Sequence, residues 1–293
     1  MSVVLQVLEI IAPVFVIAGI GVAWVAMGLE YHVQFVTRLT MTLAAPCLIF
    51  TSLVRTEIDP QALRDTALAA VVAYLAVAAV VFGLVKLARL DVRTFFAPLV
   101  FGNTGNLGLP LALFAFGNAG FDLAVVVFAV MSILSFTFGV WIVSGSGNPL
   151  TALKEPIVWG TIFGGIFLVM GWTLPEWSMN TLSLIGQMLI PIMLITLGVA
   201  VARLRPDSFR RATWLSALKY VICIAVPWGI GLLFNLPPVA HAALVMQVAT
   251  PVAVTSYMLA AKYKADSDEV ASMVVVSTVM GIAVLPLLIG FLI

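Results

Sequence analysis

Long apolar segments joined by short polar ones make up almost the whole chain, and this pattern restricts its fold more than any other feature. A helix needs about 20 apolar residues to cross the hydrocarbon core of a bilayer. Ten such segments, numbered here as spans one to ten, occupy residues 3–28, 34–54, 64–88, 94–117, 120–143, 156–174, 179–202, 211–235, 239–262 and 269–293. Only 9% of the 293 residues are charged, against about 25% in a soluble domain. We therefore predict an all-α integral membrane protein with ten transmembrane helices.

The same composition argues against several classes of function. A formal net charge of +1 provides no field for a polyanion, so nucleic acid is not expected as a partner. Cys47 and Cys223 lie in apolar segments without a CxxC motif or a histidine cluster, which predicts buried thiols and no metal or cofactor site. Serine and threonine residues occur without a partnered histidine or aspartate at membrane depth, so an enzyme is not expected.

Span four contains a stretch that a continuous helix does not tolerate. Residues 101–117 read FGNTGNLGLPLALFAFG, with four glycines, two asparagines and Pro110. Proline lacks the amide hydrogen and clashes with the carbonyl four residues earlier, and glycine does little to hold helical geometry. A break at membrane depth is tolerated only where the freed backbone groups are buried in protein or line a watery cavity. We therefore expect a site at this break.

A second interrupted stretch lies in span nine, where residues 246–263 read MQVATPVAVTSYMLAAKY. Each proline follows a carboxamide by four positions, as Asn106 precedes Pro110 and Gln247 precedes Pro251. Interrupted spans in corresponding positions of two halves indicate the midplane binding site of an inverted-repeat transporter. We expect the two breaks to cross, and each outgoing half-helix to begin beside its proline and direct its amide hydrogens at the crossing point.

Such a crossing provides neutral groups that hold a carboxylate without a buried cation. The alternative is a purely structural role. The carboxamides would then form hydrogen bonds to neighbouring helices, each contributing about 0.6 kcal/mol to stability, and the kinks would be ordinary membrane-helix kinks. Two polar breaks at matching positions favour a site over this alternative. The predicted substrate-binding residues are Asn103, Thr104, Gly105, Asn106, Pro110, Gln247, Thr250 and Pro251.

The chain divides into two related halves of five spans. Residues 144–155 form the longest polar connection and separate a first repeat, residues 1–143, from a second, residues 156–293. Pro46 in span two and Pro191 in span seven precede the crossover prolines by similar distances. Because each repeat has an odd number of spans, the second is expected to be inverted relative to the first.

Basic residues predict the orientation, because cytoplasmic loops of membrane proteins are enriched in Lys and Arg. Only Arg55 and Arg64 lie on one predicted side. The other side carries Lys86, Arg89, Arg93, Lys154, Arg203, Arg205, Arg210, Arg211, Lys262 and Lys264. This side is predicted to be cytoplasmic, which places residues 144–155 in the cytoplasm and both termini on the opposite side of the plasma membrane.

One basic residue lies inside a span. Lys219 is about eight residues into span eight, where it either snorkels to the cytoplasmic surface or sits in a cavity as the partner of an anion. The long, flexible side chain favours snorkelling. Acidic residues such as Asp65 and Asp122 lie near predicted outer ends, so a midplane carboxylate for a proton relay or a sodium site is not expected.

At the two interrupted spans the sequence resembles the auxin efflux carrier family, which includes plant PIN auxin exporters and bacterial malonate or malate permeases. The matching residues are Asn103-Thr104 and Gly108-Leu109-Pro110 in span four and residues 247–251 and 261–263 in span nine. Span seven adds residues 195–198, and span ten adds Gly281 and Leu285-Pro286. The similarity extends over nearly the whole chain.

The resemblance implies the inverted-repeat fold of bile-acid and sodium/proton carriers. Spans one, two, six and seven would form a scaffold and homodimer platform, and the other six a transport domain that moves like an elevator. Plant members carry an Asp and Lys pair early in span three, whereas residues 67–74 here have neither, and the plant cytoplasmic loop is often much longer. The chain therefore looks like the prokaryotic branch, and auxin is not expected as its natural substrate.

The residues and the resemblance together predict a secondary transporter of a small organic anion, a mono- or dicarboxylate such as malonate, malate or an auxin-like acid. A channel or a sensor built on the same fold is the alternative. Substrate identity, direction, coupling to protons or exchange, and oligomeric state are left open by the sequence.

Overall fold

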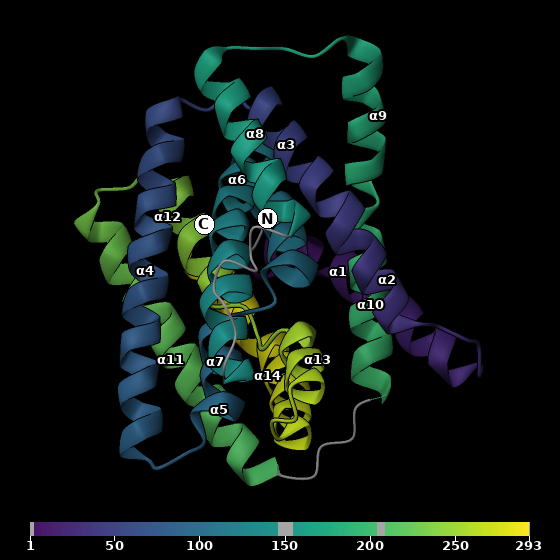
Figure 1. The fold of residues 1–293 in the computed structure, drawn as a ribbon, viewed down its shortest axis with the longest axis vertical. Helices are drawn as coiled ribbons and strands as arrows, with labels where there is room; N and C mark the ends of the chain where they lie inside the picture. Colours follow the sequence, from purple (N-terminus) through teal and green to yellow (C-terminus); the bar gives the residue numbers. More distant parts are fainter. Residues whose placement is uncertain (1–2, 146–154, 204–208, 293) are drawn as a thin grey trace.

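The computed structural model describes residues 3–145, 155–203 and 209–292, and side chains from residue 12 onward. These parts contain helices and no strand. The helices are α1 (Val3–Ala26), α2 (Val33–Leu39), η1 (Thr40–Ala44), α3 (Ala45–Arg55), α4 (Pro60–Leu87), α5 (Val92–Val100), η2 (Thr104–Gly108), α6 (Leu109–Leu134), η3 (Ser135–Gly139), α7 (Val140–Ser144), α8 (Pro156–Met170), α9 (Glu176–Gln187), α10 (Leu189–Arg203), α11 (Phe209–Leu233), α12 (Pro238–Val248), α13 (Val254–Lys262) and α14 (Ser267–Leu292), η marking π-helical turns (Figure 1). Most of the predicted linker, residues 146–154, lies outside the described parts.

Six helical stretches within the described residues are long and apolar enough to cross a membrane. They are Val33–Arg55, Pro60–Leu87, Thr104–Ser144, Glu176–Arg203, Phe209–Leu233 and Ser267–Leu292, and shorter apolar helices occupy Ala12–Ala26, Pro156–Met170 and Pro238–Val248. The fold is therefore that of a multi-pass, all-helical membrane protein.

The predicted boundary between spans four and five falls inside one helical stretch, at a sharp turn. Gly117 has φ 65° and ψ −161°, a backbone conformation that side-chain-bearing residues rarely adopt. A Cβ on Gly105 would lie 3.0 Å from the ring of Phe128, so the chain after Gly117 returns beside η2. The second part of α6 thereby forms one wall of the region where span four is interrupted.

Two of the π-helical turns each precede a proline. The turn η1 ends two residues before Pro46, and η2 ends two residues before Pro110. A π-helical turn is wider than an α-helical one. It therefore relieves the clash between the proline ring and the carbonyl four residues earlier.

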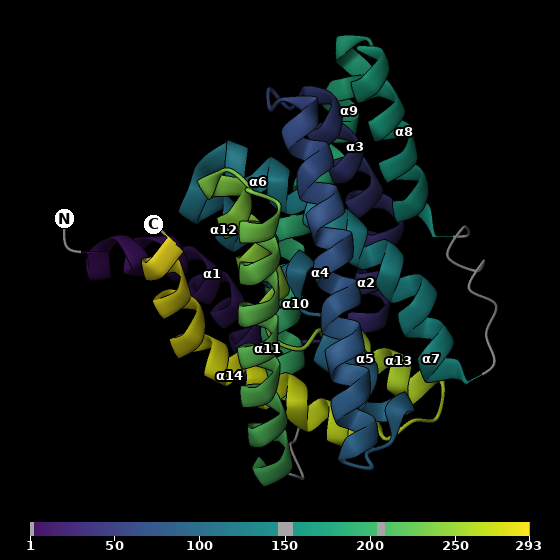
Figure 2. The ribbon, with the colours of Figure 1, turned by 90° about the vertical axis from the view of Figure 1, so that its left-hand side faces the viewer.

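Close backbone contacts join α1 to α10 and α3 to α8. A Cβ on Gly198 would overlap the carbonyl oxygen of Ala18, and one on Gly160 would lie 2.7 Å from the carbonyl oxygen of Pro46. Small residues allow membrane helices to approach in this way. Figure 2 shows the group of α3, α8 and α9 on the opposite side of the molecule from α14.

Basic loops gather at one end of the molecule, the lower end in Figure 1. Arg89, Arg93, Arg211 and Lys264 line a single surface cleft together with Asp91 and Asp266. The four basic residues belong to the set predicted to be cytoplasmic. Lys154 and Arg205 of that set lie outside the described residues.

Candidate functional site: the crossing of two interrupted helices

The breaks in spans four and nine meet inside the protein. Helix α5 ends at Val100 and α12 ends at Val248, and the extended segments that follow pair through an antiparallel bridge between Gly102 and Val252. The Asn103 amide donates a hydrogen bond of 2.7 Å to the carbonyl of Pro251. A Cβ at position 102 would overlap the hydroxyl of Thr250, so this approach requires glycine.

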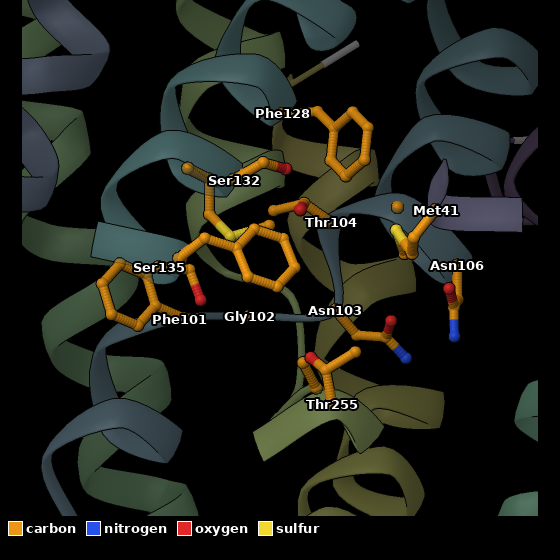
Figure 3. A pocket seen from close by; sticks show the side chains of 14 residues that line it. Met41, Phe101, Gly102, Asn103, Thr104, Asn106, Phe128, Ser132, Ser135 and Thr255 are labelled. Atoms are coloured by element: carbon orange, nitrogen blue, oxygen red, sulfur yellow. The ribbon is translucent and has the colours of Figure 1, made fainter. Parts of the chain in front are cut away.

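A small cavity adjoins this crossing. Its volume is about 30 Å³. Figure 3 shows the extended segment at Gly102 and Asn103, with Phe128 and Ser132 of α6 above it and Thr255 below. The lining residues are Met41, Phe101, Gly102, Asn103, Thr104, Gly105, Asn106, Phe128, Met131, Ser132, Ser135, Phe136, Ala253 and Thr255.

Buried polar side chains and two helix N-termini border the cavity. Asn103 is 4% exposed and Thr104 is fully buried, and within the described residues Nδ2 of Asn103 and Oγ1 of Thr104 have no hydrogen-bond partner. The first amide hydrogens of a helix have no acceptor within that helix. Here the N-terminus of η2, at Thr104, and that of α13, at Val254, both adjoin the cavity. The lining carries no Lys, Arg, Asp or Glu, so its polar character is that of neutral, donor-rich groups.

The predicted binding residues divide into two groups by position. Residues 103–106 line the cavity, whereas Pro110, Gln247, Thr250 and Pro251 do not. The Thr250 hydroxyl donates to the Gln247 carbonyl at 2.8 Å, and the Pro251 carbonyl accepts the Asn103 amide. The side chain of Gln247 is fully buried against Gly108. Thr250, Pro251 and Gln247 thus hold the crossing together outside the cavity lining.

The expectation that each outgoing half-helix begins beside its proline holds only for the α-helical part of span four, where α6 begins at Leu109 directly before Pro110. The helical part after the first break begins at Thr104, six residues before Pro110, and that after the second begins at Val254, three residues after Pro251. The wide turn η2 extends the helical part to the N-terminal side of Pro110, so the proline does not mark where the free amide hydrogens begin. Asn106 consequently lies in the outgoing half of span four and Gln247 in the incoming half of span nine.

Several lining residues were not predicted from the sequence. Ser132 and Ser135 come from the part of the chain that returns after Gly117, Thr255 from α13 and Met41 from η1. The spacing of three residues places the two serines on one face of a helix, a polar pair in an otherwise apolar span. That pair was the available signal, but the turn that brings it to the crossing is a tertiary feature.

The prediction that Lys219 snorkels to the surface is wrong. The residue is 0% exposed, and its Nζ donates to the carbonyl of Leu99 at 3.3 Å and lies 3.9 Å from Sγ of Cys223. Its side chain lies against the end of α5 instead of running toward the basic loops. The carbonyls at the end of a helix lack partners within the helix, which explains this position.

The sequence pattern of a family described as membrane transport protein matches residues 6–155 and 148–289. The chain belongs to this family. An uncharacterized transporter of Methanocaldococcus jannaschii is 22% identical over 96% of the chain and 97% of its own length. One of Methanothermobacter thermautotrophicus is 25% identical over 95% of the chain and 96% of its own length. Membership confirms the resemblance to the auxin efflux carrier family, and the chain is a membrane transporter of that family.

Proposed function

We propose that the protein is a secondary transporter of small organic anions, mono- or dicarboxylates, which bind at the crossing of the interrupted helices. One observation supports this most strongly: buried, unpartnered donors of Asn103 and Thr104 lie beside two helix N-termini. Such termini favour anions through their free amide hydrogens and their dipoles. Neutral donors bind an anion less tightly than a directly contacting Arg would, which suits a carrier that must release it.

The size of the cavity favours alternating access over a permanently open pore. Its volume of about 30 Å³ has room for about two water molecules, at about 10–15 Å³ each. A malonate ion needs more room, so in this proposal side chains of the lining move before it enters. In this proposal the described conformation has too little room for the substrate, although the partly exposed Met41, Ser135 and Thr255 leave the cavity open to the surface.

The packing also supports the proposal of two inverted repeats with ten spans. Gly198 follows Pro191 by the same seven positions as Leu53 follows Pro46. Gly198 packs on α1, and Leu53 contacts Gly164 of α8, with 3.0 Å between its Cδ1 and a Cβ built on that glycine. A repeat symmetry that relates span one to span six and span two to span seven would convert the contact between spans seven and one into the contact between spans two and six.

In this proposal α1–α3 and α8–α10 form the scaffold and homodimer platform, and α4–α7 and α11–α14 form the transport domain that moves as an elevator. Both termini lie on the outer side of the plasma membrane, with the basic end in the cytoplasm. The proposed binding residues are those of the first group, 103–106, with Pro110, Gln247, Thr250 and Pro251 outside the cavity lining.

The test is uptake of labelled malonate and malate into proteoliposomes, with membrane potential and pH gradient imposed separately. Wild-type protein should give saturable uptake that responds to one of the two gradients. Asn103→Ala should reduce affinity about 10-fold or more, because a hydrogen bond to a charged group contributes about 1.5–3 kcal/mol. Gln247→Ala should have a smaller effect, since its side chain does not line the cavity, and Arg64→Ala, at an exposed site, serves as the control.

Counterflow separates the carrier from a channel. A carrier preloaded with unlabelled substrate accumulates labelled substrate transiently, whereas a pore does not. Absence of counterflow would support the channel alternative. Strict dependence on sodium would contradict uptake driven by the membrane potential or the pH gradient. Unchanged affinity in both Asn103→Ala and Gln247→Ala would place the substrate elsewhere.

A further inference from the structure

Lys219 is a fully buried basic residue next to the crossing but outside its cavity. It lies on α11, and its Nζ contacts the carbonyl of Leu99, in the last turn of α5. Leu99 precedes Asn103 by four residues, which at full extension span no more than about 14 Å. The amino group of Lys219 therefore lies within about 17 Å of the backbone at Asn103.

Within the described residues no carboxylate neutralises Lys219. Three salt bridges are formed there, between His32 and Glu30, Arg64 and Asp65, and Arg211 and Glu269. The acidic residue of α14 that contacts α11 is Glu269, which is thus already engaged.

The titratable side chains around Lys219 are those of cysteine and tyrosine residues, not carboxylates. On α11 itself these are Cys223 and Tyr220, and Tyr220 donates to the carbonyl of Ser277 on α14 at 2.8 Å. Helix α4 contributes Tyr74, which is buried and has an unpartnered hydroxyl. Helix α12 carries no acidic residue. The carbonyl of Leu99, at the negative end of the α5 dipole, is thus the group that favours a positive charge on the amino group of Lys219.

We propose that Lys219 is the fixed counter-charge of the anion site, an ammonium that attracts a carboxylate at the crossing through space without touching it. This inference rests on the proposed function and makes Lys219 a positioning residue. A bound monoanion is then balanced by a charge that belongs to the protein. A bound monoanion consequently requires no metal cation as its counter-ion.

Coulomb's law gives the expected size of the effect. With an effective dielectric constant of about 20, removing one positive charge at about 17 Å reduces the affinity for a monoanion roughly 5-fold, and a shorter distance gives a larger loss. The interaction energy is proportional to the charge of the ligand. The factor by which the affinity for a dianion falls is therefore roughly the square of the factor for a monoanion. A purely structural effect of a substitution would reduce the affinity for both ligands by the same factor.

The first experiment compares wild-type protein with Lys219→Met, which removes the charge but keeps most of the apolar stem. Binding of malonate and of its monomethyl ester is measured by calorimetry on detergent-purified protein at pH 7.5, where the two ligands are a dianion and a monoanion. We expect the loss for malonate to be roughly the square of the loss for the ester. Equal losses, or unchanged affinity for both, would overturn the proposal while leaving the proposed function intact.

A second pair of variants tests the charge without removing the lysine. Cys223→Asp places a carboxylate next to Nζ, whereas Cys223→Asn has nearly the same shape and no charge. If Lys219 is an ammonium, the Asp variant should unfold at a higher temperature than the Asn variant and bind malonate more weakly. An Asp variant that is less stable than the Asn variant would show that Lys219 is neutral and would overturn the proposal.

This second comparison remains decisive if Lys219→Met does not fold. It also separates the two levels of inference. Wild-type protein that binds neither ligand contradicts the proposed carboxylate function, and with it the role of Lys219 in binding. The stability of the two Cys223 variants reports independently whether the cation exists.

Discussion

At the scale of single residues, glycines determine how closely the two interrupted helices approach. Gly108 lies in η2, and a Cβ at this position would overlap Oε1 of Gln247 on α12. Gln247 is fully buried, and neither polar atom of its side chain has a partner within the described residues. The crossing therefore tolerates a poorly satisfied carboxamide in exchange for a tight backbone contact.

Gly108→Ala should reduce the free energy of unfolding by about 1–3 kcal/mol, the usual cost of overpacking a buried contact. Adding Gln247→Ala should restore most of this loss, because the colliding atom is removed. A double-mutant cycle measured by denaturant unfolding in detergent gives the coupling between the two sites. The matched control is Gly83→Ala in α4, where a Cβ meets no atom within 4 Å. Additive effects of the two substitutions would contradict the predicted contact.

At the scale of elements, Arg93 links three helices at the basic end of the molecule. It lies in the first turn of α5, and its Nε donates to the carbonyl of Val143 in α7 at 3.0 Å. Its Nη2 donates to the carbonyl of Tyr263, directly after α13, at 2.8 Å. One guanidinium thus caps the C-terminal ends of two helices, where a positive charge is also favourable.

Arg93→Ala should lower the free energy of unfolding by about 1–3 kcal/mol, because two carbonyls lose a charged donor. Arg93→Lys should recover only part of this, since a lysine does not reproduce the planar fork that reaches both acceptors. Unfolding in detergent provides the measurement. Arg64→Ala, which breaks an exposed pair with Asp65, should change stability by less than about 0.5 kcal/mol. A full recovery by lysine would show that charge alone, without the fork, is sufficient.

Which elements could be predicted from the sequence depends on how local their causes are. The two breaks were predictable, because glycine, proline and asparagine disfavour a helix wherever the chain lies. The position of Asn103 followed from the first break. The exact residues at which the helices begin could not be predicted, because a π-helical turn extends the helical part to the N-terminal side of Pro110.

Tertiary contacts account for the remaining differences. Ser132 and Ser135 reach the cavity only because the chain reverses at Gly117, and no local pattern near the serines encodes that turn. Lys219 was expected at the surface on grounds of side-chain length, but the unpartnered carbonyl of Leu99 offers a buried alternative. Gln247 was placed in the cavity by its spacing from Pro251, whereas packing against Gly108 directs it away.

At the scale of the whole molecule, the cavity lies where the proposed scaffold meets the proposed transport domain. Met41 is the scaffold residue in the lining, and the other lining residues belong to the transport domain. A second contact between the two units lies between α3 and α6, where the hydroxyl of Ser52 donates to a carboxylate oxygen of Asp122 at 2.5 Å. The proposed movement of one unit against the other would break this hydrogen bond, so the bond favours the described arrangement.

Ser52→Ala should therefore shift the equilibrium toward conformations in which the cavity is wider. Losing one hydrogen bond of about 1 kcal/mol changes such an equilibrium roughly fivefold. The readout is maleimide labelling of Ser135→Cys, a cavity position, in protein whose Cys47 and Cys223 are replaced by alanine. Labelling should accelerate about fivefold in the Ser52→Ala background. Ser178→Ala is the matched control, because that hydroxyl donates to Pro175 within the scaffold and should leave the rate unchanged. Equal rates with and without the Ser52 hydroxyl would show that this contact does not restrain the opening. The two units would then be held together by other interactions, or would not move apart at α3 and α6.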